Sequence, residues 1–251
     1  MVHIVGAGPG DPELITVKGA RYLKEADVVI YAGSLVNPEL LNYCREDAQI
    51  HNSASMTLDE VVRTIEQAEK EGKMTVRLHT GDPSVYGAIQ EQMDAFRKKQ
   101  IAFDIVPGVS SCFATAAALQ QEYTLPGISQ TVIITRNEGR TPVPEPEKLR
   151  SLAQHQSTMC IYLSITMLDK VVAELIAGGY AEDTPIAIVQ RASWPEQKIV
   201  RGTLKTIVQD IEGKHIDRTA MIVVSRCLGA DYELSRLYAP EFSHMFRKAV
   251  K

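Results

Sequence analysis

The sequence of 251 residues has few cysteines, no long apolar run and no basic excess. Its four cysteines (Cys44, Cys112, Cys160 and Cys227) are scattered and form no C-x-x-C pair, which argues against a disulfide framework or a thiolate zinc site. We interpret them as small buried side chains in a reducing compartment. No apolar run approaches the roughly 18 residues that span a bilayer, and the chain does not open with a basic segment followed by an apolar one. We therefore expect a cytoplasmic protein without membrane contact.

The charge balance also excludes some functions. There are 27 basic and 31 acidic residues, a formal charge of −4, whereas a nucleic-acid partner usually requires a basic excess. The H-E-x-x-H, Walker A, EF-hand and G-x-S-x-G patterns are absent as well, and each of these would mark a particular catalytic or metal site. We expect no nucleic-acid partner and no metal bound by the protein.

The first 113 residues alternate strand signals with helix signals. We predict strands over residues 2–5, 28–31, 49–51, 75–79 and 103–106. Helix starts are indicated by Thr16, by Asn37-Pro38 and by a capping box from Thr57 to Glu60. Two further helices are expected near residues 86–99 and 111–119. Such alternation implies right-handed crossovers and a mostly parallel sheet.

The second half has a different pattern. Strands are predicted at about residues 131–135, 159–163, 185–190, 198–203 and 219–225. Only seven residues separate the third of these from the fourth, too few for a crossover helix, so this pair should be antiparallel. We predict an α/β protein of two domains: residues 1–113 with a mostly parallel five-stranded sheet, and residues 114–251 with a mixed five-stranded sheet.

The opening stretch MVHIVGAGPGDP partly matches a dinucleotide fingerprint. Gly6 and Gly8 fit G-x-G-x-x-G, but Asp11 occupies the third position, and Pro9 and Pro12 delay the helix. The second strand also ends in a stretch that offers no acidic residue for a ribose. These mismatches disfavour a nicotinamide oxidoreductase. Taken alone, the loop could be an ordinary tight β-to-α turn.

Two more glycine-containing loops follow predicted strands, TGDPSVYG at residues 80–87 and VPGVSS at residues 106–111. Each has a purely structural alternative, an Asp-Pro turn in the first and a serine helix cap in the second. Because parallel strands end at the same edge of a sheet, the three loops should lie together. They predict a pocket for a small polar molecule with an apolar part.

The motifs are far more specific in combination. VGAGPGDPELIT, GDPSVYG, VPGVSS and PIAIVQRASWPEQKIVRGTL occur in that order, and together they resemble the tetrapyrrole methylase family over residues 1–229. YAGSLVNPELL at residues 31–41 and SRLYAPEFSHMFR at residues 235–247 are similar to its precorrin-4 C-11 methyltransferases. The resemblance implies a homodimer that methylates a carbon of a cobalt-precorrin tetrapyrrole, with S-adenosyl-L-methionine as donor in a cleft between the domains.

Matching positions imply a set of donor-binding residues from both domains. Thr80, Leu163 and Ala220 stand where glycine, methionine and proline are frequent in the family. The full set is Pro9, Thr80, Gly81, Asp82, Val85, Ser110, Ser111, Leu163, Ala192, Thr219, Ala220 and Met221.

The substrate of such an enzyme carries many acetate and propionate groups, which basic side chains could bind. The candidates for substrate contact are Asp11, Arg21, His79, Arg136 and Arg191. A solvated surface role is an open alternative for each basic residue, as is a turn cap for Asp11. The donor is itself electrophilic, so that alignment of the ring carbon with the methyl group is the enzyme's main task. No catalytic base is identified.

Several other functions stay open at this point. The substrate could be metal-free precorrin-4, or the methyl group could go to another ring position. A related activity on ribosomal RNA or diphthine fits less well, because the basic excess is missing. A different class would be a tetrapyrrole- or S-adenosylmethionine-binding module without catalysis, which would bind these molecules and transfer no methyl group.

Overall fold

A computed structural model describes residues 1–229, 232–235 and 239–249. Residue contacts divide the chain into two units. The first unit comprises Met1–Thr115 and Arg191–Gln197, and the second comprises Ala116–Gln190 and Lys198–Lys251. Residues 236–238, part of the tail that resembles the precorrin-4 enzymes, lie outside the described residues.

The first unit contains a five-stranded sheet in which every pairing is parallel. Its order is β3-β2-β4-β1-β5, so β1 lies between β4 and β5. The strands are β1 (Val2–Gly6), β2 (Val28–Tyr31), β3 (Gln49–Asn52), β4 (Thr75–His79) and β5 (Phe103–Val106). The prediction of a mostly parallel five-stranded sheet is confirmed.

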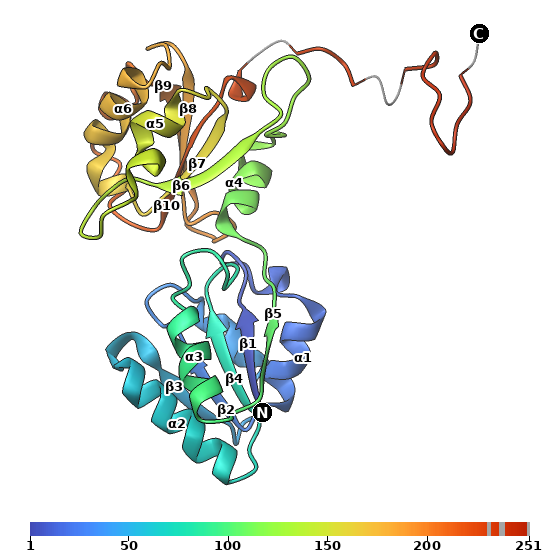
Figure 1. The fold of residues 1–251 in the computed structure, drawn as a ribbon, viewed down its shortest axis with the longest axis vertical. Helices are drawn as coiled ribbons and strands as arrows, with labels where there is room; N and C mark the ends of the chain where they lie inside the picture. Colours follow the sequence, from blue (N-terminus) through green and yellow to red (C-terminus); the bar gives the residue numbers. More distant parts are fainter. Residues whose placement is uncertain (230–231, 236–238, 250–251) are drawn as a thin grey trace. The chain divides into compact units, whose positions relative to one another are not determined.

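Helices cover both faces of this sheet (Figure 1). The helices of this unit are α1 (Val17–Glu25), α2 (Leu58–Lys70) and α3 (Gln90–Lys98), with short 3-10 helices at Pro12–Leu14, Pro38–Tyr43 and Ser53–Ser55. The helix α4 (Ser111–Leu119) begins in the first unit and ends in the second. On one face, α2 and α3 bury residues such as Ile65 and Phe96 against Ile4 and Ile30. On the other face, Leu23 of α1 packs in a second cluster of buried apolar residues. Buried apolar surface on both sides explains why the inner strand β2, with the sequence VVIY, is continuously hydrophobic.

Two helix starts test the sequence signals. The capping box is confirmed, because Thr57 Oγ1 accepts from the Glu60 N–H at 3.3 Å and Glu60 Oε2 accepts from the Thr57 N–H at 2.7 Å. The predicted helix over residues 86–99 is wrong at its start, since α3 begins at Gln90. Tyr86 and Ala88 have φ of 55° and 49°, a left-handed conformation that a right-handed helix cannot contain.

The second unit contains a mixed sheet of order β6-β7-β10-β8-β9. β6 pairs parallel with β7, and the other pairings are antiparallel. The predicted mixed sheet and the predicted antiparallel pair of β8 and β9 are confirmed. The strands are β6 (Val132–Arg136), β7 (Thr158–Tyr162), β8 (Pro185–Gln190), β9 (Lys198–Thr203) and β10 (Ala220–Val224).

One apolar core stabilises this second sheet. Residues of α5 (Leu149–Ala153), α6 (Leu168–Ala177) and α7 (Ile207–Asp210) pack with strand residues such as Ile161, Ile188 and Ile222.

All four cysteines are free, and three of them are buried. Within the described residues, no helix combines the length and the apolar character that crossing a membrane requires.

Candidate functional site

The three glycine-containing loops meet at the carboxyl edge of the first sheet. The Ala7 N–H donates to the His79 carbonyl at 2.6 Å. Gly8 and Gly81 exchange two backbone hydrogen bonds, with N···O distances of 3.3 and 2.8 Å. The first loop, residues 7–11 (loop 1), is therefore bonded directly to the second, residues 80–87 (loop 2).

Glycines allow the third loop, residues 106–111 (loop 3), to approach equally closely. A Cβ atom on Gly108 would lie 2.2 Å from the Gly81 carbonyl oxygen and 2.8 Å from the Gly6 Cα. A Cβ on Gly6 would lie 2.6 Å from the Gly108 Cα. Only residues without a side chain fit where three backbones converge in this way. The sequence reasoning that grouped these loops is confirmed by this geometry.

Asp82 joins loops 2 and 3. Its Oδ2 accepts from the Gly108 N–H at 2.9 Å, and its Oδ1 accepts from the Ser84 N–H at 2.9 Å and from the Ser84 hydroxyl at 2.5 Å. Partial burial acts to raise the pKa of Asp82, but the hydrogen bonds from Ser84 and Gly108 outweigh it and lower the pKa below its usual value. The carboxylate is therefore ionised near neutral pH and holds the two loops together.

The predicted donor residues within residues 1–113 lie on these loops. Pro9, Gly81 and Ser110 are buried, and Thr80, Val85 and Ser111 are half-buried. Ser111 begins α4, and the Phe113 and Ala114 N–H groups of that helix end donate to the Ser110 carbonyl at 3.1 and 3.2 Å. Loop 3 therefore leads directly into a helix, at the edge of the sheet where α/β proteins commonly bind small ligands.

Side chains to which the sequence patterns assigned no role at the site hold loop 1. Asn37 Nδ2 donates to the Gly10 carbonyl at 2.8 Å, and Trp194 Nε1 donates to the Pro9 carbonyl at 2.9 Å. Ser193 Oγ accepts from the Asp11 N–H at 3.0 Å. No periodicity links these distant residues to loop 1, and the one available signal was that Trp194 is the only tryptophan.

Asp11 itself caps a short helix. Its Oδ1 accepts from the Glu13 N–H at 2.9 Å at the start of the 3-10 helix Pro12–Leu14. The structural alternative of a turn cap is thus borne out, while contact with substrate stays a prediction.

His79 is enclosed, with 5% of its surface exposed. Burial, assisted by the neighbouring Arg77 charge, lowers the pKa of His79 to about 3. The ring is therefore neutral at physiological pH, and any contact it makes with a ligand is that of a neutral hydrogen-bonding group. Arg77, which the sequence reasoning missed, is also buried and donates from Nε to Gln92 at 3.0 Å and from Nη1 to the Ile30 carbonyl at 3.1 Å.

The predicted donor residues of the second unit meet at one edge of its sheet. Leu163 directly follows β7, and Ala220 begins β10, which pairs antiparallel with both β7 and β8. Leu163 and Thr219 have φ of 53° and 52° without being glycine. Such strained residues cluster at functional sites. Met221 is buried in β10, whereas Ala192, also buried, belongs to the first unit.

The basic candidates for substrate contact differ in their surroundings. Arg21 lies over the Tyr22 ring, and that ring stacks on His3 of β1. Arg21 is therefore near the start of β1, whereas the three loops lie at the opposite, carboxyl edge of the sheet. Arg136 donates to the carbonyls of residues 137, 141 and 142, and so holds its own loop. Arg191 is exposed, lies over the Trp194 ring at 5.5 Å and pairs with Glu196 at 3.5 Å.

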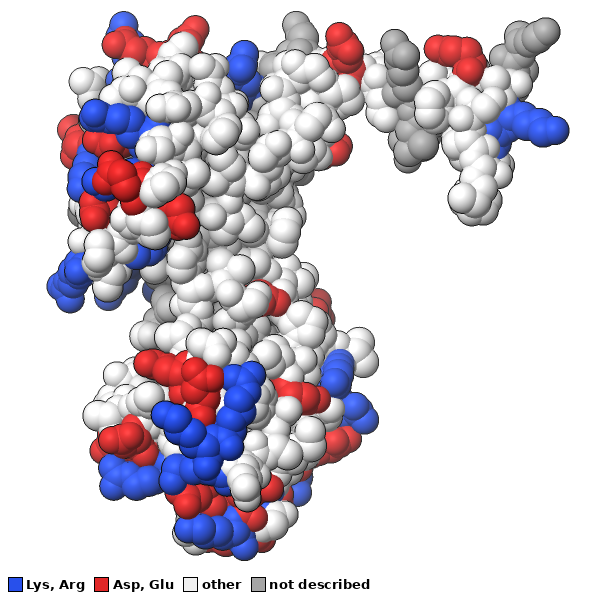
Figure 2. Space-filling model, viewed as in Figure 1, with Lys and Arg blue, Asp and Glu red and all other residues white. Residues whose placement is uncertain are grey.

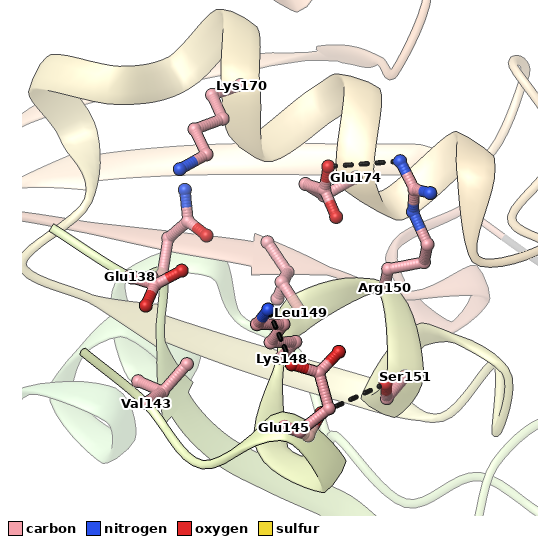
Figure 3. A pocket seen from close by; sticks show the side chains of 10 residues that line it. Glu138, Val143, Glu145, Lys148, Leu149, Arg150, Ser151, Lys170 and Glu174 are labelled. Atoms are coloured by element: carbon pink, nitrogen blue, oxygen red, sulfur yellow. Dashed lines mark hydrogen bonds and ion pairs between the residues drawn. The ribbon is translucent and has the colours of Figure 1, made fainter.

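A separate hollow of about 320 Å³ lies in the second unit, and none of these predicted residues lines it. Ion pairs line it (Figure 3): the Lys148 Nζ lies 2.6 Å from Glu145 Oε2, and the Arg150 Nη2 lies 3.2 Å from Glu174 Oε1.

On the face shown in Figure 2, basic and acidic side chains are mixed in both units. In the part of the chain that the structure describes, no three His, Cys, Asp or Glu residues are grouped to hold a metal ion.

Fold and loops agree with one protein family. The family model of the tetrapyrrole (corrin/porphyrin) methylases matches residues 1–208, and the chain belongs to this family. It is 58% identical over 251 residues to a cobalt-precorrin-4 C(11)-methyltransferase of Methanocaldococcus jannaschii, covering 100% of this chain and 97% of that relative.

Solved structures give the same result. A cobalamin biosynthetic enzyme, cobalt precorrin-4 methyltransferase, superposes with a TM-score of 0.89 at 49% identity, covering 91% of this chain and 96% of that one. The uroporphyrin-III C-methyltransferase of Thermus thermophilus, complexed with S-adenyl homocysteine, has a TM-score of 0.75 at 27% identity, covering 91% and 93%. The family inferred from the sequence motifs is therefore confirmed.

Proposed function

We propose that this protein transfers a methyl group from S-adenosyl-L-methionine to carbon C-11 of cobalt-precorrin-4, forming cobalt-precorrin-5 in anaerobic cobalamin biosynthesis. The observation that carries the proposal is the 58% identity, over the whole chain, to a relative named for this reaction. The three joined loops support it, because they form the kind of edge at which α/β proteins bind small ligands.

The donor is assigned to loops 1 to 3 of the first unit. Pro9, Gly81 and Ser110 are buried at this edge, where Gly6 and Gly108 let the three loops converge. A relative of this fold was solved with S-adenyl homocysteine, which supports a donor of the same chemistry here. Leu163, Ala192 and residues 219–221 are proposed as further donor contacts, on the strength of their match to the family pattern.

The chain's part in catalysis is placement. When bound, the donor supplies an electrophilic methyl group on a sulfonium. Loops joined by hydrogen bonds keep one geometry, and holding the reactants in line is worth up to about 7–11 kcal/mol of the barrier. Because a cation and a neutral carbon react, charge disperses in the transition state, and buried backbone that excludes water favours this.

For the tetrapyrrole carboxylates, Arg191 is the strongest candidate among the basic residues. It is exposed, next to the Trp194 and Ser193 side chains that contact loop 1. A guanidinium can bind a carboxylate with two parallel hydrogen bonds. We expect the Arg191→Ala variant to raise the KM for the tetrapyrrole several-fold and to leave the Kd for S-adenosylhomocysteine unchanged.

The resemblance also supports a cytoplasmic homodimer in which any cobalt belongs to the substrate. Multi-angle light scattering tests the dimer: the proposal expects twice the mass of the chain. A monomer at working concentration would remove this part of the proposal.

The reaction itself is tested with purified protein, cobalt-precorrin-4 and S-adenosylmethionine labelled with ¹³C in the methyl group. Mass spectrometry should show one added methyl, and NMR should place the label on C-11. Metal-free precorrin-4 serves as the parallel substrate. Methyl transfer to metal-free precorrin-4 with an equal kcat/KM would contradict the proposal that the cobalt-containing compound is the substrate.

Two outcomes would overturn the proposal. If NMR found the label on another ring carbon, the protein would be a tetrapyrrole methylase that acts at a different ring position. Tight binding of both ligands with no transfer, under conditions where a relative of known activity turns over, would favour a binding module without catalysis.

A further inference from the structure

Loop 1 is held by almost all of its own backbone groups. The N–H of Ala7 and both groups of Gly8 bond to loop 2 or to the end of β4. Three different side chains bind the Pro9 carbonyl, the Gly10 carbonyl and the Asp11 N–H. These side chains, Trp194, Asn37 and Ser193, form what we call the clasp.

The clasp fits loop 1 closely. The Trp194 indole lies so near that a Cβ atom on Gly10 would be 1.9 Å from Nε1. Arg191 and Ser193, on either side of Ala192, have φ of 49° and 72°. A non-glycine residue in this conformation is strained. The surrounding structure must offset this strain, which the hydrogen bonds to loop 1 help to do.

Asn37 makes a second, separable contribution. It is 6% exposed, and its Oδ1 accepts from the Glu39 N–H at 3.0 Å while Nδ2 donates to Gly10. The amide oxygen therefore caps the 3-10 helix Pro38–Tyr43, and the amide nitrogen serves loop 1. An aspartate here would keep an oxygen for the cap and remove the donor, so the two roles can be tested independently.

One N–H group of the loop is left over. Gly10 is a buried residue, and its N–H donates to no acceptor among the described residues. The clasp binds the carbonyl groups on either side of this N–H.

We propose that Trp194, Asn37 and Ser193 are positioning residues that hold loop 1 in the geometry required for methyl transfer. This inference rests on the proposed function. The clasp residues act through the loop 1 backbone: loops 2 and 3 still hold the donor when the clasp is lost, but the alignment of the reactants is then poorer. The predicted signature is a loss in kcat at saturation with little change in donor affinity, because misplacement by about 1 Å can cost 10²-fold in rate.

The first experiment uses the fact that Trp194 is the only tryptophan. Uniformly ¹⁵N-labelled protein should give one indole N–H signal, protected from solvent exchange by its bond to the Pro9 carbonyl. Adding S-adenosylhomocysteine should shift this signal. The proposal would be overturned if the indole N–H exchanged with solvent as fast as that of free tryptophan. It would also be overturned if the chemical shift of the indole signal did not change at saturating S-adenosylhomocysteine.

The second experiment compares Asn37→Asp and Trp194→Phe with Thr57→Ala. The last variant removes the α2 cap, far along the sequence from the loops, and should lower the unfolding free energy by about 1 kcal/mol without changing kcat. We expect the two clasp variants to lose at least tenfold in kcat, to change the Kd for S-adenosylhomocysteine less than threefold, and to speed amide exchange in residues 8–14.

The results separate the inference from the proposed function. If the wild-type protein methylates no tetrapyrrole, the proposed function fails, and the exchange data and the indole signal still decide whether the clasp holds a ligand-responsive loop. If the wild type is active and both clasp variants keep its kcat despite faster exchange, the clasp only stabilises the fold. Should Trp194→Phe not fold, Asn37→Asp alone decides.

Discussion

At the scale of single residues, Asp82 shows how a carboxylate in a binding loop can serve the scaffold. Both of its oxygens accept hydrogen bonds from loops 2 and 3. Asp82→Asn would direct an amide N–H at either Gly108 or Ser84. We predict at least a tenfold rise in the Kd for S-adenosylhomocysteine by calorimetry.

Ser84→Ala is the matched control for Asp82, because Ser84 is exposed and donates to the same carboxylate. The serine variant should keep the Gly108 bond and change the Kd less than threefold. Equal effects of the two variants would show that the link between loops 2 and 3 is not what donor binding requires.

His79 gives a prediction about pH. The folded protein keeps this ring neutral down to a pKa of about 3, whereas an unfolded chain protonates histidine near pH 6.5. Between these values the unfolded state binds more protons, so the unfolding free energy falls as the pH drops below 6.5, by up to about 1.4 kcal/mol per unit. Above pH 6.5 the contribution is fully present.

The measurement is urea unfolding at pH 7.5 and pH 5.5. His79→Gln should lose less stability between the two than the wild type, while His215→Gln, at an exposed position, should behave like the wild type. The same loss in all three proteins would contradict the buried neutral state of His79.

At the scale of elements, the convergence of three backbones controls the site. Gly108→Ala places a methyl group 2.2 Å from the Gly81 carbonyl oxygen, and rigid backbone cannot move aside cheaply. Overpacking of this kind costs typically 1–3 kcal/mol, and the loops must separate. We predict that this variant is destabilised by at least 1 kcal/mol and binds S-adenosylhomocysteine at least tenfold more weakly.

Gly139→Ala is its control, because the added Cβ would meet only the Met167 Cε, at 3.5 Å. That is an ordinary contact, so stability and binding should stay close to wild type. If Gly108→Ala bound the ligand normally, loop separation would have no bearing on the site.

The elements were predictable to different degrees. Apolar runs with β-branched residues located the strands, and the residues 28–31, 75–79 and 103–106 match β2, β4 and β5. The start of α3 was missed because the left-handed turns fall on Tyr86 and Ala88, residue types that rarely adopt this conformation, and because Gly87 between them was not taken as a break. The local sequence indicates which conformations a segment prefers. The turn at residues 86–88, in contrast, depends on contacts that form only in the folded chain.

The site was predictable in part for a similar reason. Glycine loops after parallel strands meet by topology alone, so their grouping followed from the order of strands and helices. The clasp did not follow, since Asn37 and Trp194 reach loop 1 from 27 and 185 residues away. A buried tryptophan N–H needs a partner, but only the folded chain identifies which carbonyl it is.

At the scale of the whole molecule, membership in the tetrapyrrole methylases agrees with both sheets and with the order of the loops. The central claim is that loops 1 to 3 bind the methyl donor. A crystal structure of the protein with S-adenosylhomocysteine tests it most directly. The ligand should contact Pro9, Gly81 and Ser110 within 4 Å, a usual contact distance; a ligand bound elsewhere, with the three loops empty, would contradict the account.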